Sequence, residues 1–397
     1  MSPFFAECRS IVRYTYPMAF SLGGLLQKAT SIFSGGEGSV IGIDIGASAA
    51  KIVQLRGSKG VAILETYGEI ALAPYAELPI GKAVKLSPEQ TAVALLDLMK
   101  EANVTARKGG ISIPFAASLI SILDLPKVDA KQLARMIPLE ARKYIPVPVD
   151  EVTLDWFVIP EDRDQGAFDR VEKQSTLRAR GQEVLLVAIH NDTIKNYQTI
   201  AETTNIHIDF FEIEIFSTVR SSIQHGLAPV LVVDFGAATT KMYVVERGVV
   251  RLSHLATQGG QHMTEMLARS LNWEFEKAER VKREHGLIAA SAYSGDENEK
   301  IKSALLSTLS GMFSEVSRVL LSYGQRHNKN VSHVVLTGGG ASLPGLIEVA
   351  HESLSAEVEI ASPFSRTEAP AFLDDVLREI GPGFAVSVGL ALRNLRK

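Results

Sequence analysis

One strand–turn–strand pattern occurs twice in this chain, and that duplication constrains the fold more than any other feature. Residues 40–55 and 230–245 each hold an apolar run that ends in an aspartate, Asp44 or Asp234, then an Asp-x-Gly-Ala turn and a second apolar run. In both copies a lysine stands seven residues after the aspartate. Two apolar runs joined by a tight glycine turn predict a β-hairpin. Because internal repeats usually report duplicated architecture, the pattern predicts two related lobes.

The two turns have the residue types of a phosphate-binding site. Gly46 and Gly236 carry no Cβ, so their backbone N–H groups can approach a ligand closely. Asp44 and Asp234 put a carboxylate at the mouth of each turn. Backbone amides in such turns bind phosphate oxygens, and carboxylates bind the hydrated magnesium ion. We therefore predict that both turns face one polyphosphate with Mg²⁺, with Asp44 and Asp234 at the metal. A single turn of this kind is common and would indicate little.

A third segment places glycines after a buried strand. Residues 334–337 form an apolar run, followed by Gly338, Gly339 and Gly340 and then by a helix start. Consecutive glycines let a flat ligand or a phosphate lie on the backbone, and a helix N-terminus favours negative charge. The alternative is an ordinary strand-to-helix turn, of which three successive glycines are less typical.

Together these three segments resemble the actin-like ATPase superfamily, which includes actin, sugar kinases, heat-shock chaperones and the bacterial FtsA and MreB proteins. The first hairpin resembles its phosphate-1 motif, the second its phosphate-2 motif, and the glycine segment its adenosine motif. The resemblance implies an α/β fold with two lobes around a nucleotide cleft, and ATP and Mg²⁺ as cofactors.

A fourth segment, residues 278–286, resembles the superfamily helix whose Glu and Lys reach the ribose and adenine edge. Here these are Glu279 and Lys282, which share one helix face because they are three residues apart. Spacing alone equally fits an ion pair on a solvated helix face. The residues that the resemblance assigns to the cofactor are Asp44, Gly46, Ala47, Ser48, Lys51, Asp234, Gly236, Ala237, Thr239, Glu279, Lys282, Gly338, Gly339, Gly340 and Ser342.

Two residues are candidates for positioning the attacking water, which the superfamily does from the helix before phosphate-2. That helix is predicted near residues 212–224, with Ser217 at the matching position and Glu214 one turn earlier. Serine is a poor water activator, and Ala47 and Ala49 stand where the superfamily often has hydroxyls. We therefore expect ATP to bind and hydrolysis to be weak at most.

The middle of the chain resembles one branch of the superfamily, the type IV pilus assembly protein PilM family. Residues 137–146 match its helix that ends in Glu-Ala-x-x-Tyr-Ile-Pro, and residues 148–155 match the Pro-x-x-Glu-Val-x-x-Asp that follows. The resemblance extends over residues 40–392, and FtsA carries the same kind of inserted subdomain. It implies a cytoplasmic scaffold of the type IV pilus, or of related type II secretion, that is peripheral at the inner membrane through its partners.

The same resemblance implies the partners. A groove between the first lobe and the inserted subdomain would bind the cytosolic N-terminal peptide of a PilN-like inner-membrane protein, with Tyr144, Ile145 and Pro146 as its wall. The alternative is that Tyr144 and Ile145 only cap their own helix. The family also implies a ring or homo-oligomer that connects to the pilus motor ATPases.

The predicted organisation follows from these segments. A closing helix after residue 385 is expected to return to the first lobe, the charged stretch 161–182 is expected to be a mobile hairpin loop, and residues 301–323 form an amphipathic core helix. The expected parts are an N-terminal appendage at 1–38, amphipathic or disordered; the first lobe at 39–114; an inserted α+β subdomain at 115–207; the second lobe at 208–384; and the closing helix at 385–397.

Composition limits the remaining function classes. The 397 residues are 46% apolar and 22% charged with a net charge of −4, which gives no general attraction to nucleic acid. The single cysteine excludes an internal disulfide and fits a reducing cytosol. No apolar stretch reaches the roughly 18 residues needed to span a bilayer, and no export signal is evident. A polymerising FtsA-like or MreB-like protein stays open; a sugar-kinase-type phosphotransferase is less favoured, because no acceptor pattern such as Gly-x-Asp lies between the hairpins.

Overall fold

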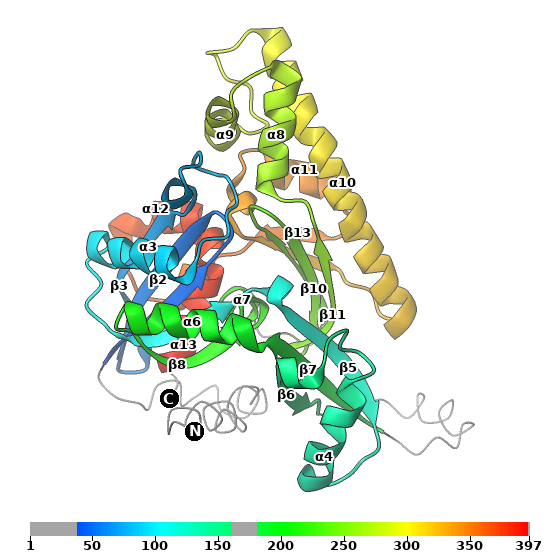
Figure 1. The fold of residues 1–397 in the computed structure, drawn as a ribbon. Coiled ribbons are helices and arrows are strands. Elements are labelled where there is room, and N and C mark those ends of the chain that lie inside the picture. The colour runs from blue at the N-terminus through cyan, green and yellow to red at the C-terminus, as the bar shows by residue number, and fades with distance from the viewer. Residues whose placement is uncertain (1–37, 161–180, 225, 227, 396–397) are drawn as a thin grey trace. The chain divides into compact units, whose positions relative to one another are not determined.

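The computed structural model describes residues 38–160, 181–224, 226 and 228–395 (Figure 1). The predictions for the N-terminal appendage and for most of the charged stretch at 161–182 therefore lie outside the described residues.

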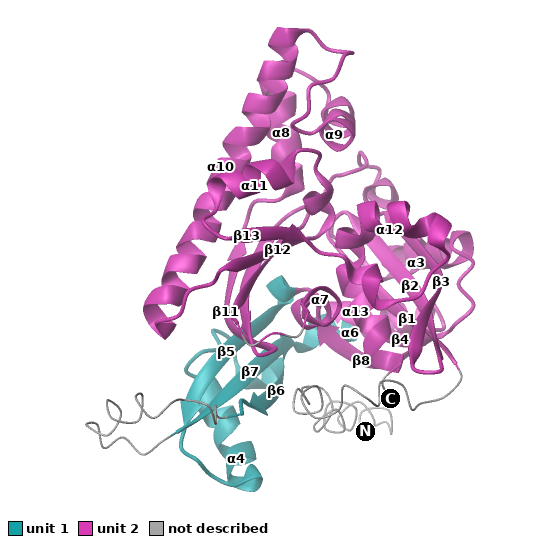
Figure 2. Cartoon of the chain, turned by 180° about the vertical axis from the view of Figure 1, so that it is seen from behind, with its two compact units in different colours: residues 1–29, 115–196 teal, residues 30–114, 197–397 magenta. Residues whose placement is uncertain are grey.

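The chain divides into two units (Figure 2). The described part of the smaller unit is residues 115–160 and 181–196, and that of the larger unit is residues 38–114 and 197–395. From sequence we placed the end of the inserted subdomain at residue 207; in the structure the division falls within helix α6, Asn191–Thr203.

The larger unit contains two five-stranded sheets with the same topology. In each sheet, the first three strands in spatial order pair antiparallel, and the last two run parallel to the third. The first sheet, in the order β3-β2-β1-β4-β8, consists of β1 Ser39–Ile45, β2 Ala49–Ser58, β3 Val61–Ala71, β4 Lys108–Ile113 and β8 His207–Ile213. We call this sheet and its helices the first lobe.

The second sheet repeats this arrangement in the order β11-β10-β9-β12-β13, and with its helices it forms the second lobe. Its hairpin β9–β10 stands where β1–β2 stands in the first sheet, so the duplicated sequence produces duplicated architecture. The strands are β9 Val230–Phe235, β10 Thr240–Glu246, β11 Val249–Ala256, β12 His333–Thr337 and β13 Glu357–Ile360.

The helices of the first lobe differ in how they begin. In α3, Pro88–Glu101, the hydroxyl of Ser87 accepts from the N–H of Gln90. The side-chain oxygen of Gln90 in turn accepts from the N–H of Ser87, which completes a capping box. Helix α7, Glu214–Ser222, directly follows strand β8, so the helix predicted at 212–224 starts two residues later. Helix α13, Ala385–Leu395, packs on β1 so closely that only glycine fits: a Cβ on Gly42 would lie 2.0 Å from the Ser387 carbonyl oxygen.

The second lobe is built on one long helix, α10, Gly295–His327. Among the described helices it alone is long and apolar enough to cross a membrane, although we expected no such stretch. Its buried residues recur every three or four positions and join the core of the second sheet, so α10 is an amphipathic core helix, as predicted for residues 301–323. The other helices of this lobe are α8 Gly260–Leu271, α9 Phe275–Glu284 and α11 Leu346–Ser353. Helix α12, Asp374–Ile380, instead packs in the core of the first lobe through Leu377.

In its described residues, the smaller unit is a three-stranded antiparallel sheet with helix α4 packed on it. The sheet order is β5-β7-β6, from Ser118–Leu125, Gln182–His190 and Val152–Val158. Helix α4, Ala130–Ala141, begins at its N-cap Asp129. Leu133, Ile137 and Ala141, one face of α4, are buried against the sheet.

Candidate functional site

The two aspartates of the repeat lie within electrostatic range of each other. Asp44 and Asp234 are the second-last residues of β1 and β9. Burial is the main cause that raises the pKa of Asp44, and the negative charge of Asp234 adds to it. The charge of Lys241 acts on Asp44 as well. The turns that the sequence places in different lobes therefore lie near each other. We call Asp44, Lys51, Asp234, Lys241 and Glu214 the hairpin site.

Each hairpin pairs its aspartate with its lysine. Asp44 stands opposite Lys51 in the β1–β2 register, and Asp234 stands opposite Lys241 in the β9–β10 register. A spacing of seven residues across a tight turn produces this cross-strand pairing in both copies, and opposite charges directly across a ladder attract.

The glycines close these turns. The N–H of Gly46 donates to Ala49 O and that of Gly236 to Thr239 O, both at 3.0 Å. A Cβ on Gly236 would lie 2.8 Å from Thr239 O, so the tightness of the turn itself requires glycine. Since these two N–H groups bond within the turns, the predicted phosphate contact falls on the following amides, those of Ala47, Ser48 and Ala237.

Asp44 is buried and hydrogen-bonded. Its side chain accepts from the hydroxyl of Ser112 on β4 at 2.7 Å. Burial raises its pKa above the usual value, and the charge of Lys51 and the Ser112 hydrogen bond offset this only in part. A divalent cation nearby would favour the charged form of this carboxyl group.

Lys51 and Lys241 have different surroundings. The Nζ of Lys51 lies 3.5 Å from Glu69 Oε1, whereas the Nζ of Lys241 lies 2.6 Å from Glu214 Oε2 and 3.1 Å from Asp234 Oδ2. Burial alone would lower the pKa of Lys241, but the charges of Asp234 and Glu214 raise it above the usual value. Lys241 is therefore a charged ammonium between two carboxylates.

The two candidates for positioning water are in different places. Glu214 begins α7 within the hairpin site, and burial raises its pKa. The hydroxyl of Ser217 is fully buried and donates to Glu212 at 2.5 Å. Burial would raise the pKa of Glu212, but the guanidinium groups of Arg220 and Arg393 lower it to about 2. Ser217 thus belongs to a structural ion cluster, and of the two candidates only Glu214 contacts the hairpin site.

The glycine segment adjoins the second hairpin. Strand β12 runs parallel to β9, with Thr337 opposite Asp234. Gly338 has a φ of 81°, and a Cβ there would lie 2.3 Å from Asp234 Oδ1. A Cβ on Gly383 would lie 3.4 Å from Lys51 Cε and 3.7 Å from Gly339 Cα, so Lys51 and the glycines border the same space. The hydroxyl of Ser342 donates to Glu379 O on α12.

Glu279 and Lys282 form a buried ion pair rather than a solvated one. Their Oε2 and Nζ atoms are 2.7 Å apart, and the Thr264 hydroxyl donates to Glu279 at 2.5 Å. Lys282 also donates to Gly260 O. The N–H of Gly260 in turn donates to Gly236 O at 2.9 Å, so this pair is linked to the second hairpin turn.

A loop of the first lobe reaches the second lobe. The N–H groups of Leu72 and Val84 donate to the carbonyls of Ser48 and Ala47, at 2.9 and 2.8 Å, so both ends of the loop are attached to the first hairpin turn. Between these ends, the N–H of Ala83 donates to Gln261 Oε1 on α8 at 2.6 Å.

The hairpin site fits a metal that arrives with phosphates. Among the described residues no group of three or more acidic, histidine or cysteine side chains could hold a metal ion. Magnesium in nucleotide sites uses one or two carboxylates together with phosphate oxygens and water. Asp44 and Asp234 match that requirement, whereas they do not form a resident metal cage.

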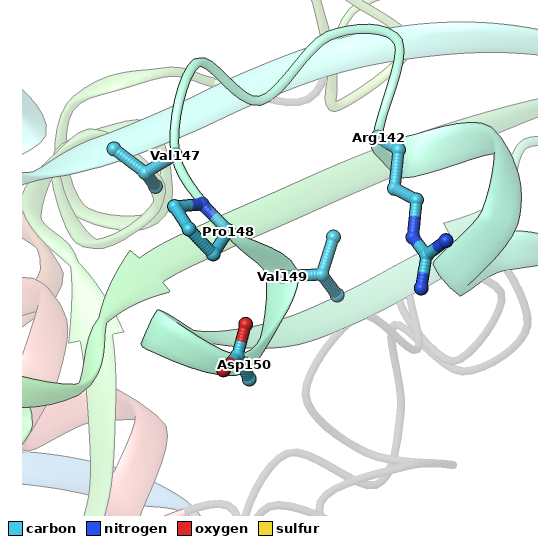
Figure 3. A pocket seen from close by; sticks show the side chains of 5 residues that line it. All are labelled: Arg142, Val147, Pro148, Val149 and Asp150. Atoms are coloured by element: carbon cyan, nitrogen blue, oxygen red, sulfur yellow. The ribbon is translucent and has the colours of Figure 1, made fainter.

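The smaller unit has a pocket beside the segment predicted to hold a partner peptide. Its volume is about 590 Å³, and its described lining is Arg142, Val147, Pro148, Val149 and Asp150 (Figure 3). Tyr144 is 46% exposed, whereas Ile145 is 8% exposed and packs in the core with α4. The partner groove at Tyr144, Ile145 and Pro146 stays a prediction.

The comparisons with known proteins decide the family. Residues 42–395 match the family model described as type IV pilus assembly protein PilM. This chain belongs to the PilM family. A solved PilM–PilN type IV pilus biogenesis complex has a TM-score of 0.73 and 23% identity, over 91% of this chain and 99% of that one. The ethanolamine utilization protein EutJ of Carboxydothermus hydrogenoformans has a TM-score of 0.52 and 14% identity, over 96% and 97% of the chains.

The relatives in sequence are cell division proteins. FtsA of Enterococcus faecalis is 22% identical over 357 residues, which are 82% of this chain and 79% of that protein. This chain spans only about half the length of several other FtsA proteins. Membership of the PilM family and these neighbours confirm the predicted actin-like α/β fold of the FtsA-like branch.

Sequence reasoning missed several residues of the site in this PilM family member. Lys241 carried a signal, because it is the lysine of the second hairpin copy, yet we assigned only Lys51 to the phosphates. Ser112, which bonds Asp44, and Gln261, which bonds the first-lobe loop, carried none. Their roles depend on contacts between segments far apart in the chain.

Proposed function

We propose that this protein is an ATP-binding scaffold of the inner-membrane assembly platform of the type IV pilus or of a related type II secretion system. Membership of the PilM family supports the assembly role. A solved structure with the same fold is a PilM–PilN complex, which supports a PilN-like partner. The protein would act in the cytoplasm and reach the inner membrane through that partner.

The observation that carries the nucleotide proposal is the meeting of the duplicated turns. Asp44 and Asp234 lie within electrostatic range, with Lys51 beside the glycine segment. ATP would place its phosphates between the turns, near the amides of Ala47 and Ala237 and the ammonium of Lys51. Magnesium supplies charge balance when bound, and Asp44 and Asp234 would hold its water ligands.

The partner would be an extended peptide. A short disordered tail gains affinity by strand addition and by a few apolar pockets. On the smaller unit, Val147, Pro148 and Val149 offer an apolar lining between the charges of Arg142 and Asp150. The exposed ring of Tyr144 stands three residues before Val147 in the chain.

The test is calorimetric titration with a synthetic N-terminal peptide of the PilN-like protein encoded in the same genome. We expect micromolar affinity or better. Tyr144→Ala should weaken it by roughly tenfold, as loss of an aromatic contact often does. Leu321→Ala, which removes an exposed apolar side chain of α10, is the matched control and should bind as the wild type does.

Two results would contradict the proposal. If the wild type binds no peptide, with or without ATP, the scaffold role loses its support. If Tyr144→Ala binds unchanged while remaining folded, that ring is not in the groove. Filaments seen by electron microscopy with nucleotide would favour the alternative that the FtsA relatives suggest, a polymerising actin homologue.

A further inference from the structure

The two lysines of the repeat occupy equivalent positions but have unlike partners. Lys51 has a contact of 3.5 Å to Glu69, whose side chain is 44% exposed. Lys241 lies between Glu214 and Asp234, and the exposed fractions of these three side chains are only 12%, 9% and 7%. Lys51 borders the glycine segment, whereas Lys241 is held between two buried carboxylates.

The short contact of Lys241 is to Glu214, not to its own cross-strand partner. Its Nζ is 2.6 Å from Glu214 Oε2 and 3.1 Å from Asp234 Oδ2. Glu214 comes from α7 of the first lobe, whereas Lys241 and Asp234 come from the second-lobe hairpin. The ammonium therefore ties a first-lobe carboxylate to the second lobe. A hydrogen bond between oppositely charged groups is among the strong ones, and burial strengthens it further.

We propose that Lys241 is a positioning residue that keeps the Glu214 carboxylate from activating water, so that bound ATP persists. This inference rests on the proposed nucleotide binding. In ATP hydrolysis, a water oxygen bonds to the γ-phosphorus, the bond from that phosphorus to the bridging oxygen breaks to release ADP, and one water proton passes to a base. Glu214 is the carboxylate of the hairpin site that stands on the helix before the second hairpin. While Glu214 Oε2 accepts from Lys241 at 2.6 Å, the ammonium neutralises the carboxylate and makes it a weaker base toward that proton.

An alternative role for Lys241 is to bind phosphate directly, as proposed for Lys51. To do so, the ammonium would leave two buried carboxylates, and both would lose their counter-charge in a buried place. The geometry therefore favours a role for Lys241 toward Glu214. The two roles differ in measurable ways, because a phosphate ligand contributes to affinity and a positioning residue contributes to the rate.

The experiment compares Lys241→Met and Lys51→Met in the full chain. Binding of ATP with magnesium is measured by calorimetry, and hydrolysis by single-turnover assays with protein in excess. We expect Lys241→Met to bind ATP within about threefold of the wild type and to hydrolyse it at least about tenfold faster, since a positioned base contributes roughly 10²–10⁴-fold. Adding Glu214→Gln should return the rate to that of the wild type. Lys51→Met should instead weaken binding.

Lys329→Met is the matched control. It removes another lysine that pairs with a buried glutamate, Glu246, in the second lobe, and it should leave the hydrolysis rate unchanged. Lys241→Leu, which removes the donor to both carboxylates while keeping an apolar stem, repeats the test if Lys241→Met fails to melt cooperatively.

The outcomes separate the two proposals. If the wild type binds no ATP, the proposed function fails and this inference fails with it. If ATP binds normally but neither Lys241 variant gains hydrolysis, only this inference is overturned. An affinity loss in Lys241→Met as large as that in Lys51→Met would make Lys241 a phosphate ligand and would also overturn it.

Discussion

Adjacent glycines after β12 should respond to alanine in opposite ways. Gly338 has a φ of 81°, and a Cβ there would lie 2.3 Å from Asp234 Oδ1 and 2.6 Å from Phe235 O. With its ψ of 167°, Gly338 lies in a region used essentially by glycine alone, where an alanine costs about 1–3 kcal/mol, and forcing an extra methyl into a packed place costs about 1–3 kcal/mol. We expect Gly338→Ala to lose about 2–6 kcal/mol of unfolding free energy. Gly339 has nothing within 4 Å of its Cβ position, so Gly339→Ala should change stability by less than about 0.5 kcal/mol.

The assay is thermal melting followed by nucleotide titration. Gly338→Ala should melt roughly 4 °C or more below the wild type, at about 2 °C per kcal/mol for a domain of this size. It should also bind ATP more weakly, because its methyl displaces Asp234. Gly339→Ala should melt as the wild type does but bind ATP more weakly, because its methyl enters the open space that we propose for the nucleotide. Equal melting temperatures for the two variants would refute the reasoning about Gly338. Unchanged ATP binding by Gly339→Ala would remove the glycine segment from the nucleotide site.

Three further predictions concern the charged groups and the link between the lobes. Asp234→Ala should lower magnesium-dependent ATP affinity by roughly tenfold or more, since hydrogen bonds to charged groups contribute about 1.5–3 kcal/mol; equal calorimetric affinity would disprove the role of Asp234. Glu212 has a folded-state pKa of about 2 against 4.5 unfolded, so its ion pairs stabilise the protein by about 3 kcal/mol above pH 4.5, and this is lost as the pH falls toward 2. The difference in urea stability between wild type and Glu212→Gln should therefore shrink between pH 6 and pH 3, and a constant difference would contradict the assignment. Gln261→Ala removes the acceptor of the Ala83 N–H, so hydrogen exchange at Ala83 should accelerate by roughly tenfold, which corresponds to the loss of about 1.4 kcal/mol of hydrogen-bond free energy. Unchanged exchange would mean that this contact does not hold the loop.

The sequence predicted most secondary structure closely, because apolar periodicity and caps are local signals. The hairpin at 40–55 became β1 and β2, and the amphipathic helix predicted at 301–323 lies within α10. Strand β8 was missed, since His207–Ile213 carries Asp209 and Glu212 and lacks a continuous apolar run. Glu212 is tolerated in that strand because Arg220 and Arg393, from two other elements, surround it.

The candidate site was only partly predictable, because a residue type indicates a chemistry but does not identify its partner. Asp44, Asp234 and the glycines were found from the repeat and from resemblance. The pairing of Ser217 with Glu212 was not, because it depends on how α7 begins after β8. Likewise, the ion pair of Glu279 and Lys282 proved to be buried, which spacing on a helix cannot reveal.

By itself the sequence determined that this protein has two related lobes of the actin-like kind. Its duplicated pattern of apolar runs, turns and opposed Asp–Lys pairs forms the same hairpin in each lobe, because that hairpin depends on local sequence. It also determined the family, through the residues around Tyr144 and Ile145. Only the tertiary structure decided that the two lysines differ. Lys51 and Lys241 have the same local sequence position, but the electrostatic state of a buried ammonium depends on the carboxylates that other elements bring to it, and α7 brings Glu214 to Lys241 alone.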